Sequence, residues 1–116
     1  MSTNRLIDDY LGDIIEAIHD IDSFVFGMEY EDFIADKKTV NAVIRSLEVI
    51  GEATKRIPVD LRQKNPYIPW KEIAGTRDKL IHEYFGVDLQ ILWETIKNDL
   101  APLEEAILSL QKDLPA

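Results

Sequence analysis

Apolar residues recur along this chain at alternating spacings of four and three positions, and this periodicity constrains the fold more than any other feature. The first stripe consists of Ile7, Leu11, Ile14, Ile18, Ile21 and Val25. Because an α-helix turns once every 3.6 residues, positions with these spacings lie along one side of a helix. Strand signals are absent from the chain. The sequence therefore predicts an all-α fold.

Two further segments repeat the pattern. Residues 37–56 carry apolar positions that continue to Ile57, and Pro58 stops the helix. The apolar face of the last segment consists of Leu89, Leu92, Trp93, Ile96, Leu100, Leu103, Ile107 and Leu110. Pro102 lacks the N–H that would bond to the carbonyl of Asn98, so we expect a bend there. Because the apolar phase continues across Pro102, one kinked helix is expected and not two.

Shorter elements are expected between these helices. The stripe of the first helix ends near Gly27, and residues 29–35 read as a short helical turn that carries Phe33 inward. Asp36 is the expected N-cap of the next helix. Residues 59–69 form a proline-rich connector with a short turn around positions 60–64. Residues 70–74 begin a helical segment that Gly75 interrupts.

A further helix is expected over residues 77–85, with Thr76 as its cap and Gly86 as its end. Asp88 then caps the last helix. Four principal helices with short connections predict an up-and-down four- to five-helix bundle, the last helix kinked near Pro102. A chain of 116 residues, 46% hydrophobic, can bury one core, so residues 1–116 are interpreted as a single domain.

The composition limits the kinds of site that the chain can form and the compartment in which it is expected. The chain has no cysteine, which excludes disulfides and thiolate sites. It has neither a signal-peptide hydrophobic region nor an apolar run of membrane-spanning length, so we expect a cytoplasmic protein without membrane contact. The two histidines lie far apart in sequence and match no metal-ligand spacing, so no metal site is expected.

The formal charge of −9 argues against general affinity for nucleic acids. The charge is uneven, however: residues 37–79 hold ten of the 13 basic residues and only five acids. This basic middle permits a localised anion site, although uneven solvated faces explain the charge equally well. Candidate rim residues for such a site are Lys37, Lys38, Arg45, Lys71 and Lys79.

Residues 77–84 contain the highest concentration of side chains that are suited to catalysis or ligand binding. Asp78 and His82 form an i, i+4 pair, so the carboxylate could orient the imidazole and favour its protonated form. Arg77 and His82 lie about 140° apart around a helix, so a partner surface or a long reach must bring them to one ligand. A solvated salt-bridge cluster, with Tyr84 at its rim, is the alternative interpretation.

Two other polar features are open to interpretation. Asn41, Arg45, Glu48, Glu52 and Lys55 recur at spacings of four and three. This stripe is a solvent-facing ladder of charges, the wall of a polar groove, or part of a subunit interface. His19 lies beside the first apolar stripe and is interpreted as a boundary residue.

The pattern Arg77-x-x-x-x-His82-x-Tyr84 on a late helix resembles the HEPN superfamily, and in particular its HepT-like toxin branch. The resemblance extends to the segments 45–53, 69–78 and 82–88, and so covers nearly the whole chain. It implies a metal-independent ribonuclease toxin that acts as a homodimer, its two motif helices meeting at a shared cleft. Its antitoxin would be a minimal nucleotidyltransferase (MntA-like) encoded beside it.

The resemblance also implies the roles of individual residues. Arg77 and His82 correspond to the catalytic pair, and Asp78 to the polar residue that follows the arginine. Tyr84 corresponds to the tyrosine that the antitoxin adenylylates. The chain itself would need no cofactor, since ATP is used only by the partner. Cleavage by the neighbouring 2′-hydroxyl would confine the reaction to RNA, possible targets including tRNA.

Two other functions compete with this interpretation. The first is a non-catalytic helical adaptor that binds a nucleotidyltransferase or a nucleotide, which the acidic charge favours and the intact Arg77 and His82 oppose. The second is an oligomerising bundle without a ligand, which leaves the polar cluster of residues 77–84 unexplained.

Overall fold

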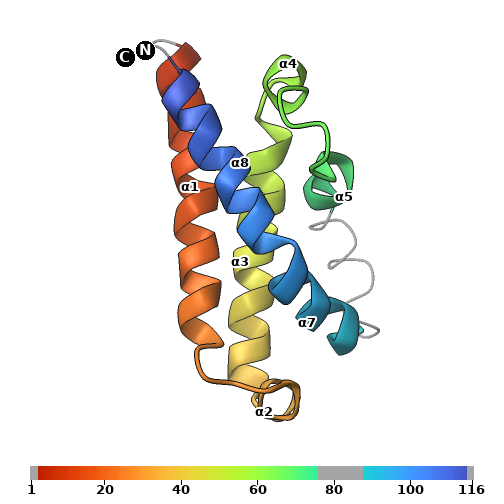
Figure 1. Cartoon of the computed structure of the whole chain (residues 1–116). Helices are drawn as coiled ribbons and strands as arrows, with labels where there is room; N and C mark the ends of the chain where they lie inside the picture. Colours follow the sequence, from red (N-terminus) through yellow and green to blue (C-terminus); the bar gives the residue numbers. More distant parts are fainter. Residues whose placement is uncertain (1–2, 76–87, 115–116) are drawn as a thin grey trace.

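The three apolar stripes become three long helical elements that face one another. In the computed structural model, which describes residues 3–75 and 88–114, these are α1 (Thr3–Phe24), α3 (Lys37–Lys55) and the pair α7 (Leu89–Asn98) and α8 (Leu100–Asp113). Helices α1 and α3 run side by side in opposite directions, and α8 crosses them diagonally (Figure 1). The described part of the chain contains no strand, which confirms the all-α helical bundle.

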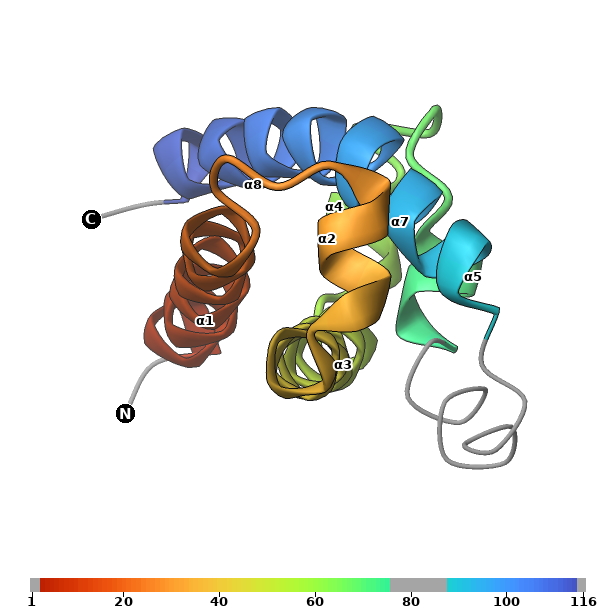
Figure 2. The same cartoon turned by 90° about the horizontal axis from the view of Figure 1, so that it is seen from below.

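The turn after α1 depends on a glycine. Gly27 has a φ of +76°, a backbone conformation that side-chain-bearing residues rarely adopt. It lets the chain turn from α1 into α2 (Tyr30–Ala35), which lies across the end of the bundle (Figure 2). Phe33 is completely buried, as the sequence predicted.

Helix α3 begins and ends close to where the sequence predicts. Asp36 caps the helix: one carboxylate oxygen accepts from the Thr39 N–H at 3.1 Å, and the other accepts from the Thr39 hydroxyl at 2.8 Å. The helix ends at Lys55, three residues before Pro58. Within it, Thr54 is fully buried, and its hydroxyl donates to the Ile50 carbonyl at 2.7 Å.

Two short helices occupy the following connector. Helix α4 (Val59–Arg62) is the turn expected around residues 60–64, and α5 (Trp70–Ala74) ends at Gly75 as predicted. Helix α5 packs against α3. The expected helix over residues 77–85, with its cap Thr76 and its end Gly86, lies outside the described residues.

The last helix differs from the expectation in one respect. The bend near Pro102 exists, but the helix is divided at Asp99 into α7 and α8 instead of continuing through a kink. The proline ring conflicts with the carbonyl four residues earlier, that of Asn98, so the helix is interrupted immediately beside it. Hydrogen bonding resumes when the Leu103 N–H donates to the Asp99 carbonyl at 3.1 Å.

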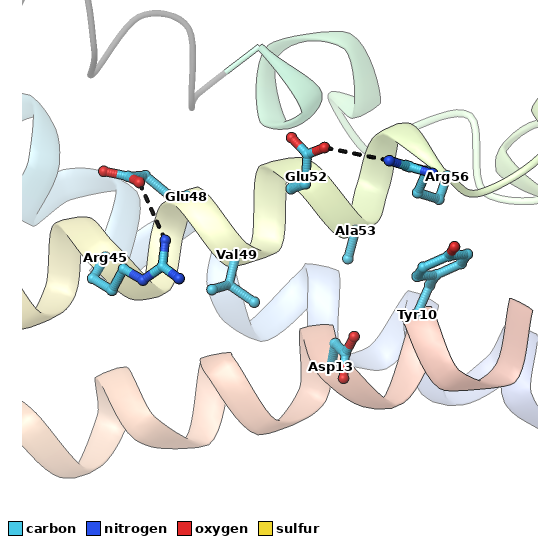
Figure 3. A pocket seen from close by; sticks show the side chains of 8 residues that line it. All are labelled: Tyr10, Asp13, Arg45, Glu48, Val49, Glu52, Ala53 and Arg56. Carbon is cyan, nitrogen blue, oxygen red and sulfur yellow. Dashed lines mark ion pairs between the residues drawn. The ribbon is translucent and has the colours of Figure 1, made fainter. Parts of the chain in front are cut away.

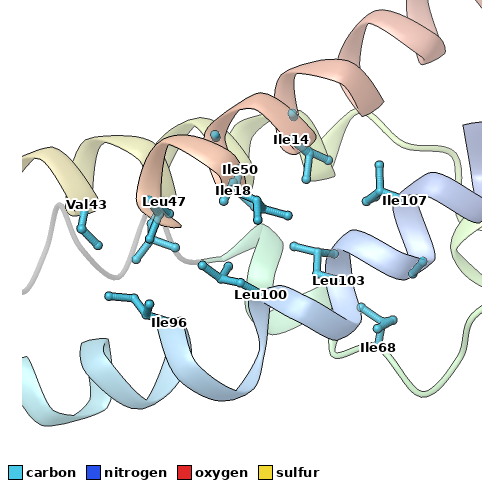
Figure 4. Close-up of a cluster of buried hydrophobic side chains, with 14 of the residues drawn as sticks. Ile14, Ile18, Val43, Leu47, Ile50, Ile68, Ile96, Leu100, Leu103 and Ile107 are labelled. Carbon is cyan, nitrogen blue, oxygen red and sulfur yellow. The ribbon is translucent and has the colours of Figure 1, made fainter. Parts of the chain in front are cut away.

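The apolar stripes meet in a contiguous core (Figure 4). All six residues of the first stripe are buried, and so are those of the second: Val40, Val43, Ile44, Leu47, Ile50 and Ile57. In the last stripe, Leu89 and Trp93 are half-buried and the other six are buried. Within residues 3–75 and 88–114, none of the helices has the length and hydropathy needed to cross a bilayer.

Substitutions of two leucines of α8, one buried and one exposed, test whether this core holds the bundle together. Leu103 is 1% exposed, whereas Leu108 on the same helix is 45% exposed. We expect Leu103→Ala to lower the free energy of unfolding by about 2–5 kcal/mol, because it removes buried methyl groups and leaves a cavity. Leu108→Ala should lower it by no more than about 0.5 kcal/mol. Urea unfolding monitored by circular dichroism measures both, and equal losses would contradict the packing described.

The cap of α3 predicts a pH dependence. Hydrogen bonds from the Thr39 backbone N–H and hydroxyl lower the pKa of Asp36 from its ordinary value of 3.8. The folded chain therefore favours the ionised carboxylate of Asp36. The stabilisation that this carboxylate contributes is complete above pH 3.8 and is lost as the pH falls through the lowered pKa.

We therefore expect Asp36→Ala to destabilise the protein at pH 7, and the difference from wild type to shrink as the pH falls below 3.8. Asp36→Asn is the control, since its amide oxygen can still accept from Thr39 but does not titrate. The difference between the Asn and Ala variants should stay constant with pH. A constant difference between wild type and Asp36→Ala would contradict the role of the charge.

Candidate functional site

The residues predicted to carry the chemistry lie together in one short segment. Residues 76–87, called the motif segment below, include Arg77, Asp78, Lys79, His82 and Tyr84. This segment lies outside the described residues. The structure describes how the chain enters and leaves this segment. Both attachments are built from side chains that the sequence analysis did not single out as functional.

Before the segment, the chain is attached through Trp70. This side chain is buried, and its indole N–H donates to the Asn65 carbonyl at 3.0 Å. The bond fastens the first residue of α5 to the connector before it, while α5 packs on α3. At Gly75 an added Cβ would lie 3.3 Å from the Lys71 carbonyl oxygen, so glycine lets the chain leave α5 at that point without crowding.

After the segment, the chain is attached through the start of α7. Asp88 caps this helix as predicted: one carboxylate oxygen accepts from the N–H groups of Gln90 at 2.9 Å and Ile91 at 3.2 Å. The attachment of the segment's end therefore depends on where α7 is held in the bundle.

An aromatic cluster holds α7 against α2. The ring centroid of Trp93 lies 5.1 Å from that of Phe33 and 6.2 Å from that of Tyr30. The ammonium of Lys97 lies 4.5 Å from the centre of the Trp93 ring, within the range of a cation–π interaction. The sequence shows the aromatic residues but not that they meet, because the members of the cluster come from two helices about sixty residues apart.

The basic candidates occupy three separate places. Lys37 and Lys38 are exposed in the first turn of α3, and Lys71 is exposed on α5, four residues before the chain reaches Gly75. Arg45 lies in the middle of α3 with its guanidinium 3.5 Å from the Glu48 carboxylate. Lys79 lies outside the described residues. Of the four described candidates, Lys71 is the one whose helix leads directly into the motif segment.

The polar stripe of α3 lines a hollow between α1 and α3. One pocket of about 460 Å³ has Tyr10 and Asp13 on the α1 side and Arg45, Glu48, Glu52 and Arg56 on the α3 side (Figure 3). A second pocket of about 520 Å³ shares Asp13, Arg45 and Val49 with the first and extends to Asp20 and Phe24. The two together are called the α1/α3 groove below. Three of the five stripe residues thus line a groove, while Asn41 and Lys55 are exposed outside it.

The charges in the α1/α3 groove make it unsuitable for phosphate. On α3, Arg45 pairs with Glu48 and Arg56 with Glu52, at 3.5 and 3.7 Å. The α1 side adds only acids, Asp13, Glu16 and Asp20. Because these carboxylates surround Arg45, it is the weakest of the basic candidates for contact with RNA.

His19 is exposed at the edge of the core, which agrees with its interpretation as a boundary residue. Its Nε2 lies 2.6 Å from a carboxylate oxygen of Glu104, so the pair links α1 to α8. No local pattern in the sequence predicts this partner, which lies 85 positions away. Among the side chains that the structure describes, no group of three or more histidines and carboxylates could hold a metal ion.

Comparison with known proteins identifies the family. A family model described as "Ribonuclease HepT-like" matches residues 14–110, a range that includes Arg77, His82 and Tyr84. A protein of Thermococcus cleftensis named "Probable ribonuclease HepT" is 54% identical over 104 residues, covering 90% of this chain and 94% of its own. No solved structure matches the chain.

Other relatives bear similar names. A protein of Methanocaldococcus jannaschii named "Putative RNase" is 51% identical over 110 residues, covering 95% of this chain and 91% of its own. One of Caldanaerobacter subterraneus with the same description is 48% identical over 105 residues, covering 90% of this chain and 94% of its own. With its helical bundle, the chain belongs to the HepT-like ribonuclease family of the HEPN superfamily.

Proposed function

We propose that this protein is a metal-independent endoribonuclease, the toxin of a toxin–antitoxin pair, in which Arg77 and His82 cut RNA. The observation that carries the proposal is the family match, which spans both residues and includes relatives named as ribonucleases. The attachments of the motif segment at Trp70 and Asp88 support it, because a catalytic group needs a fixed scaffold.

The proposed reaction uses the chemistry of RNA itself. The 2′-oxygen attacks the adjacent phosphorus, and the bond from phosphorus to the 5′-oxygen breaks. One imidazole of His82 accepts the proton of the 2′-hydroxyl, and a protonated imidazole donates a proton to the departing 5′-oxygen. Histidine suits both steps because its unperturbed pKa lies near neutrality.

Arg77 binds the phosphate during this exchange. Its guanidinium can donate two parallel hydrogen bonds to phosphate oxygens and stabilise the charge that builds up in the transition state. Asp78 lies one turn before His82 on the expected helix and would orient its imidazole. In a homodimer, two copies of Arg77 and His82 can surround one phosphate, which removes the difficulty of their 140° separation on one helix.

The acidity of the protein restricts where RNA can bind. With a net charge of −9, the chain should repel RNA over most of its surface. Among the described candidates, Lys71 on α5 is the best placed to contact RNA near the motif segment. Lys79, on the helix expected over residues 77–85, is a second candidate. RNA binding should weaken as the salt concentration rises, and the slope of that dependence reports how many phosphates the cations contact.

Tyr84 provides the control of this activity. Its hydroxyl oxygen attacks the α-phosphorus of ATP on the partner nucleotidyltransferase, pyrophosphate leaves, and an adenylyl group remains on the tyrosine. The new phosphodiester places bulk and a negative charge two residues from His82, where the RNA backbone must enter. Steric blockage and charge repulsion then act together.

Cleavage of RNA by the purified protein tests the nuclease proposal. We expect wild type to cut total cellular RNA in the presence of a chelator, and Arg77→Ala and His82→Ala each to slow cleavage by about 100-fold or more. His19→Ala is the matched control, since this exposed histidine pairs with Glu104 and should leave the rate unchanged. RNA binding without cleavage by wild type would favour the non-catalytic adaptor instead.

A second test separates inhibition from catalysis. We expect Tyr84→Phe to retain cleavage but to gain no adenylyl mass, and to stay active, when incubated with ATP and the nucleotidyltransferase encoded by the neighbouring gene. Tyr67→Phe is the control, because Tyr67 is a 69% exposed tyrosine outside the motif. It should be modified and inhibited like wild type. Loss of cleavage in Tyr84→Phe would assign the phenol a catalytic role.

A further inference from the structure

The connector between α4 and α5 presents an exposed aromatic ring on an anchored turn. Tyr67 is 69% exposed, although Ile68 and Trp70 beside it are buried in the core. The Tyr67 hydroxyl donates to the side-chain oxygen of Asn65 at 3.2 Å, and the Ile68 N–H donates to the Asn65 carbonyl at 3.1 Å. Prolines before Tyr67 and after Ile68 restrict the backbone further. The ring is therefore held in solvent in a fixed position, so a ligand that binds to it pays little to order it.

The surroundings of this ring are basic, although the chain as a whole has a net charge of −9. Residues 55–75 contain five bases against two acids: Lys55, Arg56, Arg62, Lys64 and Lys71 against Asp60 and Glu72.

Two of these bases flank Tyr67 in the chain with exposed ammonium groups. Lys71 is exposed on α5 and has no ion-pair partner within the described part of the chain. The ammonium of Lys64 lies 3.9 Å from the Asp113 carboxylate, but both side chains are about half exposed, so this pair is weak. Lys64 and Lys71 can therefore bind phosphates on the two sides of the Tyr67 ring.

The connector lies at the edge of the bundle from which the chain enters the motif segment. Helices α4 and α5 lie on the side of α3 away from α1 (Figure 1). Between Tyr67 and Gly75 the chain consists largely of the five residues of α5. At about 3.6 Å for each extended residue and about 1.5 Å for each helical one, the two positions lie within about 20 Å of each other. A strand bound at the connector is thus close to the segment proposed to cut it.

We infer that Tyr67 is a stacking platform for an unpaired base of the RNA substrate, and that Lys64 and Lys71 bind the phosphates beside that base. Every base has a π-face, so this contact requires no particular sequence. A base can lie on the ring only when it is free of a duplex, so the contact selects single strands, loops and ends. This inference rests on the proposed nuclease function and adds the class of RNA that the nuclease accepts.

The charges around the ring favour RNA as its occupant. A second exposed aromatic ring, that of Phe26 with 88% exposure, lies in the turn after α1. That turn is at the end of the bundle opposite α4 (Figure 1), and the acids Asp22 and Glu29 are close to it in the chain. Acids there would repel phosphates, whereas the lysines flanking Tyr67 attract them. Phe26 therefore provides a matched aromatic control.

Binding of a short fluorescein-labelled single-stranded 2′-O-methyl RNA, measured by fluorescence anisotropy, tests the platform. This RNA lacks the free 2′-hydroxyl that the proposed reaction needs, so it stays intact with the wild-type protein. We expect Tyr67→Ala and Tyr67→Leu each to raise the Kd about fivefold or more, because neither keeps a ring. Tyr67→Phe keeps the ring and should bind and cleave RNA like wild type. Lys71→Ala should raise the Kd and reduce the salt slope by about one.

The controls separate stacking from general effects. Phe26→Ala should leave the Kd unchanged, and circular dichroism verifies that each variant is folded. A duplex of the same sequence should bind about tenfold more weakly, with a Kd that Tyr67→Ala does not alter. The inference is overturned if wild type binds the duplex as tightly as the single strand, or if Phe26→Ala weakens binding as much as Tyr67→Ala. An affinity unchanged in both Tyr67→Ala and Tyr67→Leu would also overturn it, and would leave the ring as a contact for a protein.

Cleavage assays with unmodified RNA separate this inference from the nuclease proposal. We expect Tyr67→Ala to raise KM and leave kcat unchanged, since the ring contacts the strand and not the bond that breaks. Cleavage that depends on Arg77 and His82, with the same KM in Tyr67→Ala as in wild type, would refute the platform and leave the nuclease standing. Binding that depends on Tyr67, without any cleavage by wild type, would support the platform and refute the nuclease.

Discussion

The burial of the apolar stripe of α1 between α3 and α8 is the interaction on which the rest of the structure depends. Leu11, Ile14 and Ile21 are completely buried, although α1 also carries six of the acids in its exposed turns. A helix this acidic gains stability mainly from packing, because its like charges oppose the compact state. Once α1 is held, α3 supplies the surface on which α5 packs, and α8 fixes the direction from which α7 arrives.

The scaffold confines the motif segment through two different kinds of contact. At its start, an indole N–H bonded to a backbone carbonyl fixes Trp70 within the connector. At its end, the cap at Asp88 and the aromatic contacts of Trp93 with α2 hold the first turns of α7. Neither contact involves a residue of the proposed reaction. The residues that hold the two ends of the motif segment are therefore distinct from those proposed to cut RNA.

Charge is divided between surfaces with different tasks. Three acids of α1, Asp13, Glu16 and Asp20, line the α1/α3 groove, whereas Lys71 lies on α5, beside the chain's entry into the motif segment. Acidic surfaces repel the phosphates of nucleic acids, so contact between this chain and RNA is expected only where cations are exposed.

The sequence by itself determined the helices, their caps at Asp36 and Asp88, the inward Phe33 and the family, because periodicity, capping and motif spacing are local properties. It also indicated a bend near Pro102. Tertiary structure decided the pairing of His19 with Glu104, the Trp93 cluster, and the groove that Arg45, Glu48, Glu52 and Asp13 line together. These depend on how distant helices are placed relative to one another, and a one-dimensional pattern records which face of a helix is polar but not what lies opposite it.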